Sequence, residues 1–387
     1  MRLLYVNDAL AIWGGLERLL ADQMNMLVEM FGYEVHLATV NQGDHPLPYP
    51  LHSSITHTDL GIGLHHKYRY KGLKRLWKMA ELELKYIRRL RKLVRKVRPD
   101  IIVLMRFEHW EVYFCTQGIP LVVESHSMCR GNLFGPSTWQ QLSWVTMSKY
   151  LAKRARVVVT LTEGDASDWT RYTPHVCVIP NVVHLNESGR YSHVTAKSVI
   201  FTSRIAPQKD VFTLLKIWEI VHKRHPEWVL NVYGEGEQEV EFRQEVEAMD
   251  ANICLHTPTR AIMERFIESS MLVLTSIFEP FGLVMPEAMS CGLPVVSFDS
   301  PYGPEDIITD GVDGFLVRNR NVSDFADRIC QLMEDEPLRI RMGKAAVQSA
   351  QRYAADKIMP LWNDLFTRIG SQKLSTSYLA GKSYRQS

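Results

Sequence analysis

Hydrophobic residues follow two alternating patterns from the start of the chain to about residue 370. One pattern is a short apolar run of strand length, and the other is a longer segment in which apolar residues recur at helical spacing. The strand-length runs are at residues 3–6, 34–40, 101–104, 121–123, 157–161, 176–179, 199–202, 228–233, 254–258, 271–276, 295–298 and 313–317. Strands that alternate with helices in this way predict an α/β fold with parallel sheets.

The predicted elements form two halves that meet at a turn signal, Pro180-Asn181. Helical spacing predicts helices at residues 16–30, 67–98, from about 211, 323–333, 338–353 and 356–369. A chain of 387 residues is long enough for two domains. We therefore predict two doubly wound, Rossmann-like domains facing across a cleft, at residues 1–180 and 181–360. The tail from Ser371 is rich in Ser, Tyr, Lys and Gln and is expected to be flexible.

The composition narrows the class of protein. Hydrophobic residues make up 46% and charged residues 23%, which is typical of a soluble globular protein, and the net charge of +2 gives no reason to expect nucleic acid as a partner. No apolar run is long enough to cross a bilayer, and the first residues are a poor signal peptide. The six cysteines are far apart without a C-x-x-C pair, so we expect reduced thiols in the cytoplasm.

The stretch FEPFGLVMPEAMSCG, residues 278–292, carries two carboxylates, Glu279 and Glu287. It follows an apolar run, Pro286 suits a first helical turn, and Gly292 suits the position after a helix. The pattern predicts a strand, a turn and a short helix, whose N-terminus would favour an anion while the carboxylates accept hydrogen bonds from sugar hydroxyls. A phosphorylated sugar or a nucleotide sugar has both the anionic group and the hydroxyl groups that this arrangement would bind. Either glutamate alone would more simply be a helix-stabilising or solvated turn residue.

Other candidates stand in loops after predicted strands. Arg204 and Lys209, in SRIAPQKD, are either a diphosphate clamp or two ordinary surface cations. The glycines Gly14-Gly15 and Gly234 are either backbone sites for a phosphate or plain turns. His126 follows a strand at the edge where open α/β sheets bind ligands, although a lone histidine is more often structural.

Residues 279–296, EPFGLVMPEAMSCGLPVV, resemble the E-x7-E signature of the retaining GT-B glycosyltransferases of family 4. SRIAPQKD is similar to the R-x4-K element of the same family. The resemblance covers nearly the whole chain and is strongest over residues 201–317. It implies transfer of a sugar, with retention at the anomeric carbon, from a nucleotide donor to an acceptor hydroxyl. It also implies that a helix near residues 361–387 returns to the first domain.

The resemblance assigns roles to the candidates. Arg204 and Lys209 would bind the donor diphosphate, and Glu287 would bind the ribose. Glu279 and His126 are the catalytic candidates at the donor sugar, where His126 would bind a sugar hydroxyl or assist nearby. Further donor-site positions are the backbone of Phe281, Gly282, Leu283 and Val284, together with Gly14, Gly15 and Gly234. No metal or cofactor is expected. The loop 299–305 departs from the usual glycine-rich turn and resembles that of members acting on hexose or N-acetylhexosamine donors, which suggests a UDP-sugar.

Residues 67–98 concentrate positive charge. The basic residues are Lys67, Arg69, Lys71, Lys74, Arg75, Lys78, Lys85, Arg88, Arg89, Arg91, Lys92, Arg95, Lys96 and Arg98. Apolar residues near helical spacing accompany them, including Leu76, Trp77 and Tyr86. The segment is either an interfacial membrane surface or a solvated helix that packs one face on the sheet, and the two are compatible.

A membrane surface would place the protein in the cytoplasm, peripherally on the inner face of the cell membrane. The acceptor would then be a glycan or a lipid-linked sugar in the biosynthesis of cell-surface polysaccharide, such as capsule or lipopolysaccharide. Two alternatives remain open at this stage. One is a nucleotide-sugar epimerase of the same fold, which would need no acceptor. The other is a non-catalytic glycosyltransferase-like subunit, which would be expected to lose donor-site residues.

Overall fold

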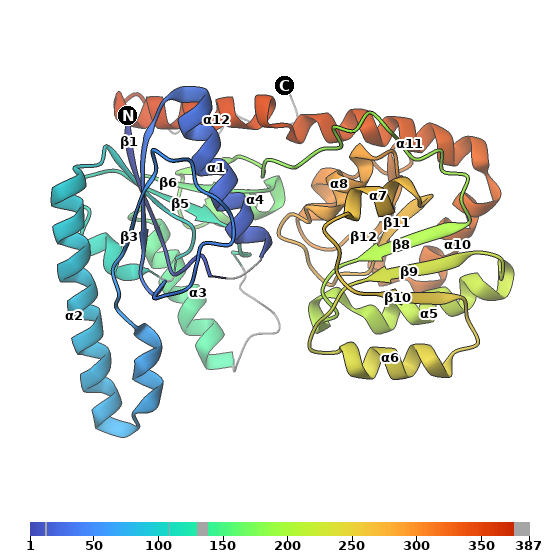
Figure 1. Ribbon diagram of the computed structural model, residues 1–387, viewed down its shortest axis with the longest axis horizontal. Coiled ribbons are helices and arrows are strands. Elements are labelled where there is room, and N and C mark those ends of the chain that lie inside the picture. Colours follow the sequence, from blue (N-terminus) through green and yellow to red (C-terminus); the bar gives the residue numbers. More distant parts are fainter. Residues whose placement is uncertain (12–13, 108, 130–137, 375–387) are drawn as a thin grey trace. The chain divides into compact units, whose positions relative to one another are not determined.

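A computed structural model describes residues 1–11, 14–107, 109–129 and 138–374. The chain divides into two compact units (Figure 1). Unit 1 comprises Met1–Val182 and the chain from Ala355 onward, and unit 2 comprises Val183–Ala354. The units therefore divide after Val182 and after Ala354, whereas the sequence analysis placed its boundaries after residues 180 and 360. Both units are α/β layers around a parallel sheet.

The described strands of unit 1 form one sheet of seven parallel strands in the order β3-β2-β1-β4-β5-β6-β7. The strands are β1 (Arg2–Asn7), β2 (Glu34–Thr39), β3 (Thr56–Asp59), β4 (Ile101–Leu104), β5 (Leu121–Ser125), β6 (Val157–Thr160) and β7 (Val176–Val178). The helices are α1 (Gly15–Phe31), η1 (Leu64–Arg69), α2 (Gly72–Val97), η2 (Trp110–Phe114), α3 (Thr138–Ala152), α4 (Glu163–Thr170) and α12 (Ala355–Gly370). The sequence pattern did not predict β3, because its residues THTD are polar and lie at the edge of the sheet.

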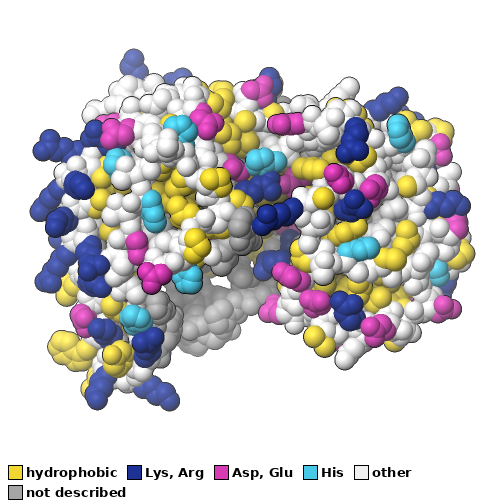
Figure 2. Space-filling view, viewed as in Figure 1, with side chains coloured by type: hydrophobic (Ala, Val, Ile, Leu, Met, Phe, Trp, Pro, Cys, Tyr) yellow, Lys and Arg dark blue, Asp and Glu magenta, His cyan; other side chains and the backbone are white. Residues whose placement is uncertain are grey.

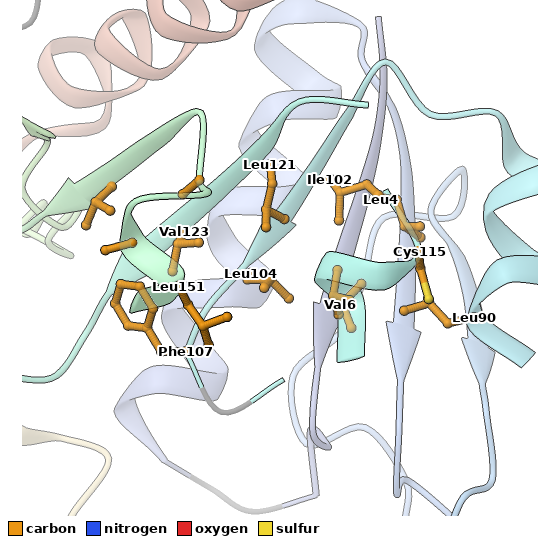
Figure 3. Close-up of a cluster of buried hydrophobic side chains, with 14 of the residues drawn as sticks. Leu4, Val6, Leu90, Ile102, Leu104, Phe107, Cys115, Leu121, Val123 and Leu151 are labelled. Atoms are coloured by element: carbon orange, nitrogen blue, oxygen red, sulfur yellow. The ribbon is translucent and has the colours of Figure 1, made fainter. Parts of the chain in front are cut away.

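Successive side chains of a strand point to opposite faces, so the sheet of unit 1 has two apolar layers. Leu4 and Val6 face a buried cluster that includes residues of α2, α3 and α4 (Figure 3). Leu3 and Tyr5 face a second cluster, which includes residues of α1 and α12. This burial on both faces explains why β1 is continuously apolar in the sequence. It also explains why α12, from the far end of the chain, belongs to unit 1.

The described strands of unit 2 form a parallel sheet in the order β10-β9-β8-β11-β12-β13. The strands are β8 (Ser198–Thr202), β9 (Val229–Tyr233), β10 (Ile253–His256), β11 (Met271–Leu274), β12 (Val295–Phe298) and β13 (Gly314–Val317). The helices are η3 (Pro207–Lys209), α5 (Val211–Arg224), α6 (Glu239–Ala248), α7 (Ile262–Ile267), α8 (Val284–Ser290), α9 (Gly303–Ile307), η4 (Arg318–Arg320), α10 (Val322–Glu334), α11 (Glu336–Ala350) and η5 (Gln351–Tyr353).

Two predicted segments differ in detail from the structure. The single helix expected at residues 67–98 is divided into η1 and α2, and Gly72 at the start of α2 has a φ of +56°. Glycine adopts this left-handed conformation without steric cost, which permits the break. The expected flexible tail falls mainly on residues 375–387, which lie outside the described residues, whereas Leu374 is buried and its carbonyl oxygen accepts a hydrogen bond from Arg156.

A buried carboxyl group joins β5, α4 and the segment that follows β5. Asp165 of α4 accepts hydrogen bonds from the Cys129 backbone N–H at 2.9 Å, the Ser125 hydroxyl at 3.2 Å and the Trp169 indole N–H at 3.2 Å. Trp169 in turn stacks on Phe107 with ring centroids 4.7 Å apart. Burial raises the pKa of Asp165 to about 7.

The raised pKa predicts a pH dependence of stability. The ordinary pKa of aspartate is about 3.9, so between about pH 4 and pH 7 folded Asp165 keeps a proton that the unfolded chain has released. The unfolding free energy should therefore fall as pH rises through this window, by up to about 1.4 kcal/mol per pH unit. Asp165→Asn should flatten this slope in urea unfolding followed by tryptophan fluorescence. Asp356→Asn, at an exposed position of α12, is the control and should leave the slope unchanged. Equal slopes in the wild type and Asp165→Asn would show that the raised pKa of Asp165 is not the cause of the pH dependence.

Candidate functional site

The candidate donor-site residues of unit 2 follow two neighbouring strands at the centre of its sheet. β8 and β11 pair with each other, and the strand order reverses between them. Ligands of open α/β sheets bind outside the carboxyl ends of the strands at such a reversal. Arg204 and Lys209 lie in the connection from β8 to α5, and Glu279 and Glu287 lie in the connection from β11 through α8. The topology therefore brings the two sequence motifs to one edge.

Lys209 and Glu279 form an ion pair between Lys209 Nζ and Glu279 Oε1. The same carboxylate oxygen accepts a hydrogen bond of 2.7 Å from the Ser276 hydroxyl. The side chains of the pair are only 12% and 5% exposed, respectively. Withdrawing two charges from water carries a desolvation cost, which the ion pair and the hydroxyl offset. A cation and a carboxylate are thus held together at the place where the sequence analysis predicted the binding site for the diphosphate and the donor sugar.

Hydrogen bonds between the two connections fix the position of this pair. The Ile277 backbone N–H donates to the Gln208 carbonyl oxygen at 2.8 Å, and the Gln208 side-chain amide donates to the Phe278 carbonyl oxygen at 3.1 Å. The Thr275 hydroxyl donates to the Lys209 carbonyl oxygen at 2.9 Å. The backbone that carries Lys209 is therefore tied directly to the backbone that carries Glu279.

Arg320, which the sequence analysis missed, supports the same two connections from η4. Its guanidinium donates to the Ser276 carbonyl oxygen at 2.9 Å, to the Thr275 carbonyl oxygen at 3.0 Å and to the Asp210 carboxylate at 2.5 Å. The guanidinium carbon lies 4.4 Å from the ring centroid of Phe298. In the sequence, Arg320 stands in the polar run RNRN after a strand, which indicates only a solvated turn. No local signal could have identified it.

Two glycines permit the turn between Glu279 and α8. Gly282 has a φ of +90°, in the left-handed region that glycine favours. Gly303 allows a close approach, because a Cβ atom there would lie 1.9 Å from the Phe281 carbonyl oxygen. The Gly303 backbone N–H donates to the Glu279 carbonyl oxygen at 2.8 Å. The loop after β12 therefore supports the turn, and the sequence analysis did not assign Gly303 this role.

The remaining motif residues lie as the local pattern predicts. Leu283 precedes α8, Val284 begins it, and Glu287 stands half-buried in its first turn. Phe281 is buried, and its ring lies edge-on to Tyr353 with centroids 5.3 Å apart. Only the backbone of Phe281 is therefore suited to a ligand.

Gly234 shapes the loop that carries Arg204. A Cβ atom at Gly234 would lie 2.0 Å from the Ser203 carbonyl oxygen, so the turn after β9 approaches the backbone beside Arg204 closely. The Ile205 backbone N–H donates to the Glu235 carbonyl oxygen at 2.9 Å, which holds the two loops together. Arg204 itself is exposed and donates to the Gln208 side chain at 3.2 Å. Unlike Lys209, it makes no ion pair among those found in the described residues.

His126, Gly14 and Gly15 belong to unit 1. His126 directly follows β5, and its Nε2 lies 3.1 Å from Glu124 Oε2, a carboxylate that is buried at the end of the same strand. The Gln23 side chain of α1 donates to Glu124 Oε1 at 3.3 Å. Against an ionised carboxylate, which only accepts, Nε2 acts as the donor, so a neutral ring would have Nδ1 as its accepting nitrogen. Gly14 and Gly15 stand at the start of α1, with Gly14 as its N-cap.

Several other features bear on the chemistry of the described residues. They contain no group of three or more histidine, cysteine or acidic side chains placed to hold a metal ion. None of their helices is long and apolar enough to cross a membrane. The six cysteines are free thiols, and burial raises the pKa of Cys115 to about 11 and that of Cys291 to about 12. These two thiols are therefore protonated at neutral pH and unsuited to nucleophilic catalysis.

Comparisons with known proteins relate this geometry to relatives. AmsD, the amylovoran biosynthesis glycosyltransferase of Erwinia amylovora, is 26% identical over 94% of this chain and 99% of its own length. An exopolysaccharide phosphotransferase of Streptomyces coelicolor is 32% identical, but the match covers 52% of this chain and only 21% of that protein. A crystal structure of TarM from S. aureus, with fondaparinux, alpha-GlcNAc-glycerol and UDP, has a TM-score of 0.75 at 17% identity and covers 94% of this chain and 99% of TarM. At that identity the likeness shows the fold.

Two family models divide the chain between them. Residues 13–187 match the model described as Glycosyltransferase Family 4, and residues 190–349 match the model described as Glycosyl transferases group 1. The first match lies almost entirely on unit 1 and the second on unit 2. The chain belongs to the family 4 glycosyltransferases of the GT-B fold.

Proposed function

We propose that this glycosyltransferase transfers a hexose or N-acetylhexosamine from a UDP-sugar to a hydroxyl of a glycan or lipid-linked acceptor, with retention at the anomeric carbon and without a metal. The ion pair between Lys209 and Glu279 at the β8–β11 reversal carries the proposal. The name of AmsD, a relative over nearly the whole chain, supports a role in polysaccharide biosynthesis. The UDP and alpha-GlcNAc-glycerol in the TarM structure support a UDP-sugar donor and the transfer of an N-acetylhexosamine. We place the enzyme in the cytoplasm, peripherally on the inner face of the membrane.

The proposed chemistry begins with an exchange of partners at Lys209. The donor diphosphate replaces Glu279 as the main partner of the Lys209 ammonium group, and Arg204 turns from Gln208 to bind the same diphosphate. Glu279, still held by the Ser276 hydroxyl, then faces the donor sugar. Glu287 accepts hydrogen bonds from the ribose hydroxyls. As the bond between the anomeric carbon and the diphosphate oxygen breaks, the acceptor hydroxyl oxygen bonds to that carbon on the same face and its proton passes to the departing UDP. The two cations stabilise the negative charge that develops on the UDP.

His126 would contribute from unit 1. The buried Glu124 carboxylate orients the imidazole ring through Nε2, which leaves Nδ1 to accept a hydrogen bond from a sugar hydroxyl. The hydrogen bond from Gln23 restrains Glu124 in turn. His126 is therefore proposed to position a sugar.

A UDP-release assay tests the proposed function as a whole. UDP-glucose, UDP-galactose and the UDP-N-acetylhexosamines are each incubated with the enzyme, with and without glycan and lipid-linked acceptors. We expect acceptor-dependent UDP release with one donor, and NMR of the product should show the anomeric configuration of the donor. Conversion of the donor sugar without an acceptor would instead indicate an epimerase. Donor binding without any turnover would indicate a non-catalytic subunit.

Arg204 and Lys209, the two residues proposed to bind the diphosphate, should differ in what their removal does to stability. Arg204→Ala and Lys209→Ala should each weaken UDP binding by about 1.5–3 kcal/mol, as expected for hydrogen bonds to a charged group. Only Lys209→Ala should also destabilise unit 2, by about 3–5 kcal/mol, because it leaves the buried Glu279 without its cation. Calorimetric titration and thermal unfolding measure the two effects. Lys223→Ala, at an exposed position of α5, is the control. Unchanged UDP affinity in both site variants would remove these cations from the site.

The two glutamates should have separable roles. Glu287→Gln should weaken the binding of UDP and of UDP-sugar alike, because both contain the ribose. Glu279→Gln should leave UDP affinity unchanged or higher, since it removes the carboxylate that competes for Lys209, while kcat falls more than about tenfold, equivalent to about 1.4 kcal/mol in the barrier. UDP titration measures the effect on binding, and steady-state kinetics measures the effect on kcat. The reverse pattern would show that the roles have been assigned the wrong way round.

Arg320 should act as a positioning residue. Arg320→Ala removes the donors to Thr275, Ser276 and Asp210, so we expect weaker UDP binding and a loss of about 2 kcal/mol of stability. Arg320→Lys should restore much of the stability through Asp210, but less of the UDP affinity, because an ammonium group lacks the planar fork of donors. Arg318→Ala, at an exposed position of the same turn, is the control. If Arg320→Ala binds UDP as tightly as this control does, the positioning role is wrong.

A further inference from the structure

The first turns of α2 carry large apolar side chains in water. Leu73 is 76% exposed, Leu76 is 61% exposed and Trp77 is 78% exposed, and Tyr70 just before the helix is 42% exposed. Isolated exposed apolar residues are common, but a contiguous group marks an interaction site. We call residues 69–78 the arm tip. In Figure 1 this end of α2, together with η1, extends past the sheet of unit 1.

The exposed residues form a second apolar stripe on α2. Leu73, Leu76, Trp77 and Leu84, which is 52% exposed, follow the three- and four-residue spacing of one helical face. The buried stripe is separate and consists of Leu82, Tyr86, Leu90, Val94 and Val97. A helix that only packed on its own sheet would need one stripe. The second stripe is therefore available to another partner.

The charges around the arm tip have one sign. Arg69, Lys71, Lys74 and Arg75 are all exposed, and the sequence has no acidic residue between Asp59 and Glu81. In Figure 2, apolar side chains at this end of α2 lie among those of lysine and arginine. Apolar residues with a tryptophan, bordered by cations, match the interface of an anionic bilayer, where the tryptophan lies at headgroup level.

Basic residues later in α2 have structural roles instead. Lys85 donates to the Gly61 carbonyl oxygen at 2.9 Å, and Arg89 donates to the carbonyl oxygens of Leu60 and Gly61. Arg91 donates to the Phe114 carbonyl oxygen at 3.2 Å. These contacts hold residues 85–97 of α2 against the rest of unit 1, and we call them the fastened half. The basic residues predicted over 67–98 are thus divided between the fastened half and the arm tip.

We propose that the arm tip inserts Leu73, Leu76 and Trp77 into the headgroup region of an anionic phospholipid bilayer, with Lys71, Lys74 and Arg75 against the lipid phosphates. The charge complementarity favours a bilayer over a symmetric contact with a second copy of the chain, because in such a contact the arm tip would meet a surface of equal positive charge. The inference deepens the proposed membrane location by naming the surface. It does not involve the UDP site in unit 2.

Sedimentation of the full chain with vesicles tests this proposal. Vesicles of equal parts phosphatidylglycerol and phosphatidylcholine should bind the protein at low salt, and vesicles of phosphatidylcholine alone should bind it at least about tenfold less. Leu73→Ser/Leu76→Ser/Trp77→Ser and, separately, Lys71→Gln/Lys74→Gln/Arg75→Gln should each reduce binding to the anionic vesicles by about tenfold or more. Arg88→Gln/Lys92→Gln/Lys96→Gln removes the same number of charges from the fastened half and should keep more than about half of the binding.

A second readout reports insertion directly. Brominated lipids should quench the tryptophan fluorescence of the wild type, and Trp77→Phe should lose most of that quenching while still binding the vesicles. UDP affinity, measured on every variant, should be unchanged, so this proposal and the proposed function can fail separately. No sedimentation of the wild type with anionic vesicles would overturn the inference, as would an equal loss of binding in the control. A dimer in solution that the serine variant dissociates would overturn it as well, by assigning the arm tip to a second copy of the chain.

Discussion

The ion pair between Lys209 and Glu279 is the constraint around which unit 2 is arranged. Its partners come from two connections that the pairing of β8 with β11 brings to one edge of the sheet. The Ser276 hydroxyl, the Gln208 amide and the Arg320 guanidinium then fix those connections to each other. A largely buried ion pair is a costly way to gain stability. The cost fits the proposed function, in which the donor diphosphate replaces Glu279 as the partner of Lys209 and the carboxylate then faces the sugar.

Much of the fold could be predicted from the sequence because burial on both faces leaves continuous apolar runs. β1, β4 and β12 are examples, since each is fully or almost fully buried. β3 could not be predicted, because an edge strand with half-exposed side chains needs no apolar residues. The break between η1 and α2 also left no clear pattern. A single glycine at residue 72, with basic residues before and after it, interrupts an otherwise helical spacing.

The candidate site could be predicted only where its residues lie within one local motif. Glu279, Gly282 and Glu287 stand close together in the sequence, and their turn and helix follow the predicted order. Arg320 is 110 residues from Asp210, which it contacts, and Gln23 is 101 residues from Glu124. Only the parallel pairing of the strands brings such residues together. The basic segment is an intermediate case, because its charge was evident in the sequence but the exposure of Trp77 and the contacts of Arg89 required the structure.

A crystal structure of the chain with UDP bound is the most direct test of the exchange at Lys209. The account predicts that Lys209 Nζ donates a hydrogen bond to a diphosphate oxygen at roughly 2.7–2.9 Å, as in charge-assisted hydrogen bonds. Arg204 should contact the same diphosphate, and Glu287 should accept hydrogen bonds from the ribose. UDP bound elsewhere, with the pair of Lys209 and Glu279 undisturbed, would contradict it.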